Sequence, residues 1–142
     1  MKRAARLEPV LQRLLEAERQ ARHRLAVCEA QWATERARLA DLHRYAGEYR
    51  QRTQAGAVPV VTLRDHQQFI GRLEQLALNQ ERTAQAAGLA CDRAREELLR
   101  RQRRSEGLRR LIERYRVQAR QVAEQREQRA LDDWVSSRQR AG

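Results

Sequence analysis

The sequence has few of the residues that build a compact globular core. Aromatic residues make up 4% of the 142 residues, and there are only six glycines and two prolines. The remainder is rich in Ala, Leu, Arg, Glu and Gln, a composition typical of a coiled coil or a long helix. The apolar runs are only a few residues long, which excludes a transmembrane helix. No apolar segment follows the basic start Met1-Lys2-Arg3, so we expect no secretory signal and a cytoplasmic protein.

The groups that carry catalysis are also scarce. His23, His43 and His66 lie far apart in the sequence, and there is neither an HExxH motif nor a glycine-rich phosphate loop. Cys28 and Cys91 have no CxxC partner, so we expect two small buried residues rather than a metal site or a redox pair. The sequence therefore predicts a protein without enzymatic activity, cofactor, metal or small-molecule substrate.

Negative charge is under-represented. Thirty basic residues stand against 19 acidic ones, giving a formal net charge of +11, and Lys2 is the only lysine. Such a balance is compatible with nucleic-acid binding through counterion release, but acidic residues are interspersed in both halves. We favour a solvated face or a surface for an acidic protein partner, and we keep nucleic-acid binding as the alternative. The densest basic block comprises Arg100, Arg101, Arg103, Arg104, Arg109, Arg110, Arg114 and Arg116.

One stretch, Ala55–Thr62, combines glycine with proline, and three of the four residues Val58–Val61 are β-branched and poor helix formers. The flanking segments consist of good helix formers. Thr62 and Asp65 resemble a capping box, which places the start of the second helix near Leu63. The sequence predicts an all-α, single coiled-coil domain over 1–142, with one helix over about 7–54, a turn over 55–62 and a second helix over about 63–137.

Apolar residues repeat at alternating spacings of four and three along both helices, and we call these positions the seam. A seven-residue repeat of this length predicts a supercoiled partner helix rather than a globular core. In the first helix the seam comprises Leu7, Leu11, Leu14, Glu18, Ala21, Leu25, Cys28, Trp32, Glu35, Leu39, Leu42, Ala46 and Tyr49. In the second helix it comprises Ile70, Leu73, Ala77, Gln80, Ala84, Ala87, Cys91, Ala94, Leu98, Arg101, Ser105, Leu108, Ile112, Tyr115, Ala119 and Val122.

Folding about Pro59 would place the helices antiparallel, with the numbers of paired residues adding to about 119. This register sets large residues opposite small ones, as close packing requires. It also sets Glu18 opposite Arg101, so that two charges that interrupt the seam would form a pair. Further expected pairs are Tyr49 with Ile70, Ala46 with Leu73, Leu42 with Ala77, Trp32 with Ala87, Cys28 with Cys91, Leu25 with Ala94, Ala21 with Leu98, and Leu11 with Leu108.

The second helix is expected to be longer than the first. Pairing would end near Ile112 and leave about 25 residues, spanning about 38 Å, without an intramolecular partner. Unpaired apolar residues on a helix indicate either a partner or a frayed end, and we favour a partner because Trp134 is among them. The other apolar residues of this segment are Tyr115, Val117, Val122, Leu131 and Val135.

Most of the aromatic residues gather near the turn. Tyr45, Tyr49 and Phe69 lie there with Leu42, Leu73 and Leu76. Seam positions among them are expected to form core, whereas Tyr45, Phe69 and Leu76 fall off the seam. The sequence leaves open whether this cluster is ordinary core or a hot spot for protein binding.

Several short motifs occur in a fixed order around the turn. They are Arg6-Leu7-Glu8-Pro9-Val10-Leu11, then Tyr45-x-x-x-Tyr49, then Phe69-Ile70-x-Arg72-Leu73 with Gln80, and finally Gln128-Arg129-x-Leu131-Asp132-Asp133-Trp134. With these motifs the sequence resembles the flagellar export protein family FliJ over nearly its whole length. It resembles the stalk proteins of virulence type III secretion more distantly.

The resemblance implies a soluble component of the bacterial flagellar protein export apparatus, with roles in flagellum biogenesis and motility. Members of this family are antiparallel two-helix coiled coils, and we expect a monomer when free. They enter the export ATPase hexamer, contact the cytoplasmic domain of the membrane export gate, and are linked to export chaperones. The implied location is cytoplasmic, peripherally at the cell membrane. The alternatives are a nucleic-acid-binding coiled coil and a substrate chaperone without stalk function.

The resemblance also implies two sets of contact residues. The export-gate surface would comprise Leu42, Tyr45, Tyr49, Phe69, Leu73, Leu76 and Gln80, with Arg38 at its polar edge. The ATPase surface would comprise Leu7, Leu11, Leu14, Leu108, Ile112, Tyr115, Val122, Leu131 and Trp134.

Overall fold

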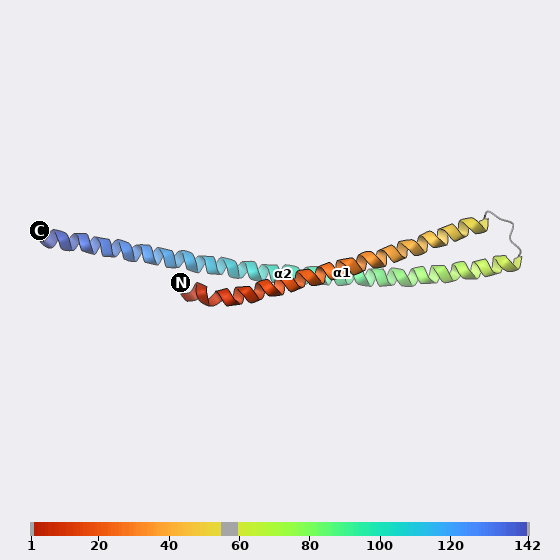
Figure 1. Cartoon of the computed structure of the whole chain (residues 1–142), viewed down its shortest axis with the longest axis horizontal. Coiled ribbons are helices and arrows are strands. Elements are labelled where there is room, and N and C mark those ends of the chain that lie inside the picture. The colour runs from red at the N-terminus through yellow and green to blue at the C-terminus, as the bar shows by residue number, and fades with distance from the viewer. Residues whose placement is uncertain (1, 55–59, 142) are drawn as a thin grey trace. The chain divides into compact units, whose positions relative to one another are not determined.

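The computed structural model describes residues 2–54 and 60–141, all of them helical. Helix α1 spans Lys2–Gln54, which is 53 residues, and helix α2 spans Val60–Ala141, which is 82 residues. The predicted turn falls largely on residues 55–59, which lie outside the described residues. Two helices of unequal length confirm the predicted all-α hairpin with a longer second helix (Figure 1).

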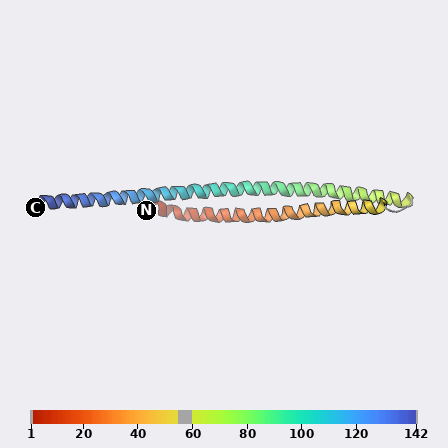
Figure 2. The ribbon, with the colours of Figure 1, turned by 90° about the horizontal axis from the view of Figure 1, so that it is seen from above.

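The contacts divide the chain into two units, and in each a segment of α1 lies antiparallel to a segment of α2. Unit 1 contains residues 1–20 and 99–142, and unit 2 contains residues 21–98. The views in Figures 1 and 2 agree that the two segments of unit 1, the start of α1 and the later part of α2, lie side by side. Within residues 2–54 and 60–141, neither helix has a stretch apolar and long enough to cross a membrane.

The predicted seam is the buried surface of both helices. All of its α1 positions are buried or half-buried, and so are its α2 positions up to Ala119. Fully buried positions are interspersed with half-buried ones, as expected for two helices packed along one stripe. In unit 1 the core centres on Ala4, Leu11 and Ile112, with Leu7 and Leu108 packed against it.

The cross-helix contacts agree with the predicted register to within one heptad. Paired residue numbers stay close to the expected sum of about 119 in both units. Charged pairs flank the seam, where exposed side chains can reach across it, and each adds little stability. The contacts in unit 1 include Arg3–Tyr115, Glu8–Arg116 and Glu18–Ser105, and those in unit 2 include Glu29–Arg95, Trp32–Gly88, Glu35–Gln80, Tyr49–Phe69 and Arg50–Glu74.

Helix α1 begins at Lys2, more than a turn before the expected start at Leu7. Pro9 lies inside the helix, although it has no backbone N–H to donate to the preceding turn. Ala4 is buried against the unit 1 core, so packing of this first segment on α2 stabilises helix on both sides of the proline.

The start of α2 also differs from the prediction. The helix begins at Val60, so Thr62 lies within its first turn and does not cap it as expected. No acidic residue lies in that first turn, so Asp65 does not make the expected favourable interaction with the helix dipole. β-Branched residues lower helix propensity only slightly, and a long helix packed along its seam tolerates them.

The unpaired end of α2 is shorter than expected. Because α1 starts early, pairing extends past Ile112, and both Tyr115 and Ala119 are half-buried. Every residue from Arg120 to Ala141 is exposed, including Val122, which the repeat had placed in the seam. This segment, which we call the overhang, is about 33 Å long at 1.5 Å per residue. Its first residues still lie near the start of α1, since Val122, Ala123 and Arg126 line one groove with Lys2 and Arg3, and its remainder continues with no helix of unit 1 beside it (Figures 1 and 2).

Two glycines on α2 differ in their surroundings and should respond differently to substitution. A Cβ at Gly107 would meet no atom within 4 Å, so Gly107→Ala should stabilise the protein by about 0.5–1 kcal/mol through helix propensity. A Cβ at Gly88 would lie 3.1 Å from Nε1 of Trp32, so Gly88→Ala should gain less or destabilise. Urea unfolding of both variants checks this, and equal gains would contradict the close Trp32–Gly88 packing.

Candidate partner-binding surfaces

An aromatic cluster joins α1 and α2 in unit 2. The ring of Tyr49 lies 4.7 Å from that of Phe69 and 5.0 Å from that of His66, centroid to centroid. Tyr45 meets Phe69 edge-on at 6.4 Å with an interplanar angle of 76°, a favourable arrangement for two rings. Nδ1 of His66 is buried and has no hydrogen-bond partner in the described part of the chain. The helix pairing therefore brings Tyr45, Tyr49 and Phe69 together as expected.

The residues predicted for the export-gate surface divide between core and surface. Leu73 is buried, and Leu42, Tyr49, Phe69 and Gln80 are half-buried. Tyr45 is 49% exposed and Leu76 is 53% exposed. Exposed apolar and aromatic groups that rest on a buried base have the character of a protein-binding hot spot.

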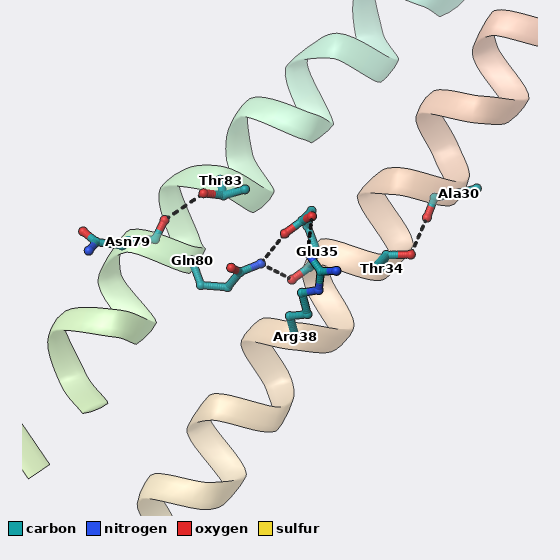
Figure 3. A network of polar contacts seen from close by, with 7 residues as sticks. All are labelled: Ala30, Thr34, Glu35, Arg38, Asn79, Gln80 and Thr83. Atoms are coloured by element: carbon teal, nitrogen blue, oxygen red, sulfur yellow. Dashed lines mark hydrogen bonds and ion pairs between the residues drawn. The ribbon is translucent and has the colours of Figure 1, made fainter. Parts of the chain in front are cut away.

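A polar layer formed by Glu35, Arg38 and Gln80 interrupts the seam of unit 2 (Figure 3). Nε2 of Gln80 donates to the backbone oxygen of Glu35 at 3.0 Å and also to its carboxylate oxygen Oε2. Nη1 of Arg38 lies 3.0 Å from Oε1 of the same carboxylate. Both carboxylate oxygens of Glu35, which is only 8% exposed, therefore have polar partners in this layer.

Unit 1 has a second polar layer, which also interrupts the seam. The hydroxyl of Ser105, which is buried, donates to Oε1 of Glu18 at 2.8 Å. Glu18 is half-buried and comes from the seam of α1, as Glu35 does. The expected pairing of Glu18 with Arg101 stays a prediction, whereas the contact with Ser105 was not anticipated.

The residues predicted for the ATPase surface also divide into two groups, all of them in unit 1. Leu11 and Ile112 are buried in the core, and Leu7, Leu108 and Tyr115 pack against it. These side chains hold α1 on α2, so they are not free to form an external contact surface. In the overhang, by contrast, Leu131 is 59% exposed and Trp134 is 57% exposed. The guanidinium of Arg138 lies over the Trp134 ring, 4.8 Å from its centroid.

The basic block lies on α2 within unit 1. Apart from half-buried Arg101, its arginines are exposed. Arg116 pairs with Glu8 across the two helices, and Arg3 lies 5.6 Å from the centroid of the Tyr115 ring. The arginines of the block are therefore largely solvated, and Arg116 also makes a contact between the helices.

A comparison with protein families shows which family this chain belongs to. The family model described as "Flagellar FliJ protein" matches residues 1–141. The chain belongs to the FliJ family. Comparisons with curated proteins and with solved structures found no match. Membership makes this FliJ-family protein a coiled-coil component of flagellar protein export, in a family of non-enzymatic proteins. Among its described residues, no three His, Cys, Asp or Glu side chains converge as a metal site requires.

Sequence reasoning missed two features of this FliJ-family protein. Glu35 and Gln80 were each recognised as interruptions of the seam, and the register sum of about 119 brings them to nearly the same layer. The rule that a buried polar group has a hydrogen-bond partner would have been enough to predict that these two residues pair. His66 was treated as isolated, although it lies one helical turn before Phe69, on the same face of α2.

The two cysteines share a layer of unit 2, as predicted. Burial raises the pKa of the Cys91 thiol above its usual value of 9.0, and the neighbouring Cys28 thiol raises it further. Cys91 is fully buried and Cys28 is half-buried, and both are free. The folded protein thus keeps Cys91 as a neutral thiol.

This burial predicts a stability loss at high pH. Because the pKa of Cys91 is higher in the folded state, the unfolded state releases the proton first as pH rises above 9.0. The contribution of Cys91 to stability is therefore complete at neutral pH and declines as the pH rises through the folded pKa. Urea unfolding at several pH values should show a steeper decline for the wild-type protein than for Cys91→Ala. Parallel declines would contradict the buried neutral thiol.

Proposed function

We propose that this protein is a stalk that couples the export ATPase to the membrane export gate. Through the gate it would associate peripherally with the cytoplasmic face of the cell membrane. The chain supplies binding surfaces and no chemistry, and export chaperones are further candidate partners. Family membership and the presence of one exposed surface in each of the two units support this proposal.

The ATPase surface is assigned to the overhang. The observation that carries the proposal is the exposure of Leu131 and Trp134 on a helical segment whose residues 120–141 all face solvent. Large apolar side chains concentrated on one segment indicate a protein partner. The predicted residues Leu7, Leu11, Leu14, Leu108, Ile112 and Tyr115 would support this surface by holding α1 against α2.

The gate surface is assigned to the aromatic cluster of unit 2. Tyr45 and Leu76 supply exposed apolar area, and the ring of Tyr45 contacts Phe69, which in turn packs against Tyr49. Aromatic side chains provide large contact areas at little cost in conformational entropy. Gln80 and Arg38 give this surface a polar edge, where Gln80 is held by Glu35.

Binding assays with the two isolated partners test the proposal. The full chain is immobilised and offered the purified export ATPase, and separately the soluble domain of the gate. We expect saturable binding of both partners, with neither dependent on nucleic acid. Absence of both interactions would refute the coupling role. Binding only to nucleic acid, with a steep loss as salt increases, would support the alternative function.

A further inference from the structure

Glu35 occupies a position where an apolar residue would serve stability better. It is a seam residue of α1 and is only 8% exposed, yet it carries a carboxylate. Burying a charge has a desolvation cost that its polar partners offset only in part, and well-packed apolar replacements of such groups are often neutral or stabilising. The polar layer is therefore explained poorly by stability alone.

The contacts of Glu35 fix the orientation of a neighbouring amide. Both atoms that Gln80 approaches on Glu35 are oxygens, which accept and cannot donate, so the amide nitrogen must face them. Its two N–H groups are then used, and the carbonyl oxygen Oε1 is the remaining polar atom. No hydrogen bond to Oε1 occurs among the described residues.

The other carboxylate oxygen of Glu35, Oε1, accepts a hydrogen bond from Nη1 of Arg38. Arg38 is bound through Nη1 alone, and its side chain is 64% exposed, so the remaining N–H groups stay accessible. Gln80 and Arg38 line one groove of about 550 Å³ together with Leu42 and Tyr45. Two oriented polar groups thus lie beside the apolar part of the proposed gate surface.

We propose that Glu35 is a positioning residue for this surface, holding Gln80 and Arg38 in the orientation that a partner recognises. The inference rests on the proposed gate-binding function and deepens it. The recognised segment would donate an N–H to the carbonyl oxygen of Gln80 and place a carboxylate at the guanidinium of Arg38. Arg44 lines the same groove and pairs with Asp41 at 2.8 Å, as Arg38 pairs with Glu35, but of these two arginines only Arg38 is held by a seam carboxylate.

The second polar layer offers a matched control. Glu18 is also a seam carboxylate of α1 that accepts a hydrogen bond from α2, but it lies in unit 1 and outside the gate surface. Leucine at either position restores the apolar repeat. The two substitutions Glu35→Leu and Glu18→Leu therefore change the same chemistry at sites with different proposed roles.

Affinity and thermal stability are measured for both variants in the full chain. We expect Glu35→Leu to keep or raise Tm and to weaken binding to the soluble gate domain by about tenfold, the value of one charge-assisted hydrogen bond. Glu18→Leu should keep or raise Tm and leave this affinity unchanged. Glu35→Gln, which retains an acceptor of the same shape, should lose less affinity than Glu35→Leu. Wild-type affinity in Glu35→Leu, or an equal loss in Glu18→Leu, would overturn the proposal.

A readout without the partner separates this inference from the proposed function. In ¹H–¹⁵N spectra of the free full-length protein, the side-chain amide protons of Gln80 should exchange with solvent at least about tenfold more slowly than those of exposed Gln67. Glu35→Leu should remove this protection. Exchange in the wild-type protein as fast as that of Gln67 would overturn the positioning role, whether or not the gate domain binds. A protected amide combined with no gate binding would refute the proposed partner instead.

Discussion

Ending the chain after Ala119 is expected to abolish binding to the export ATPase while leaving the helix pair intact. The deletion removes the overhang, whose residues are all exposed and contribute nothing to the buried seam. The Tm of the remaining protein should therefore stay within a few degrees of the wild-type value. ATPase affinity should fall at least about 100-fold, because the deletion removes the apolar side chains assigned to that contact.

Point substitutions locate this effect within the overhang. The double variant Leu131→Ala with Trp134→Ala should reproduce most of the affinity loss measured by surface plasmon resonance. Gln121→Ala with Gln125→Ala changes two exposed polar residues of the same segment and should bind as the wild type does. Full ATPase affinity in the truncated protein would show that the contact lies elsewhere on the chain.

Phe69→Ala should produce the second large effect, a loss of at least about 30-fold in affinity for the soluble gate domain. The substitution removes the ring that contacts both Tyr45 and Tyr49, so the exposed Tyr45 loses its support. Phe69 is half-buried, and a Tm decrease of several degrees is also expected. Affinity is therefore compared by calorimetry well below the Tm of each variant.

Leu78→Ala is the matched control for this substitution. Leu78 is an exposed apolar residue of α2 in the same unit, but it does not belong to the aromatic cluster. This substitution should leave the affinity for the gate domain within about twofold of the wild-type value, since scattered exposed leucines need no partner. Similar losses in both variants would indicate that general apolarity, and not the cluster, determines binding.

The fold followed from the sequence because one stripe repeats along both helices. Each position from Leu7 to Tyr49 that the repeat assigned to the seam is buried or half-buried, and the alternation of large and small residues sets the register. This inference needs no tertiary information. A repeat that continues over so many turns is consistent with few arrangements other than a partner helix.

The ends of the helices did not follow from the sequence. Local rules place Pro9 near a helix start and Thr62 at a cap, yet both residues lie inside helices. Packing of Ala4 against Leu11 and Ile112 is a tertiary effect that outweighs the missing hydrogen bond at Pro9. It also determines where the overhang begins, since α2 is paired only as far as α1 reaches.

The candidate surfaces were only partly accessible from sequence. The repeat separates seam from non-seam residues, so the exposure of Tyr45 and Leu76 could be anticipated. The list implied by family resemblance mixed exposed residues with core residues such as Leu11 and Ile112, because resemblance does not distinguish them. The contacts of Glu35 depend on side-chain geometry across two helices and required coordinates.

Simultaneous binding of both partners tests the coupling role most directly. The proposed gate surface lies wholly in unit 2 and the overhang lies wholly in unit 1, so neither surface shares a residue with the other. Size-exclusion chromatography with multi-angle light scattering should show a single ternary complex of the full chain, the export ATPase and the soluble gate domain. Displacement of one partner by the other, with only binary complexes at saturating concentrations, would contradict a protein that couples the two.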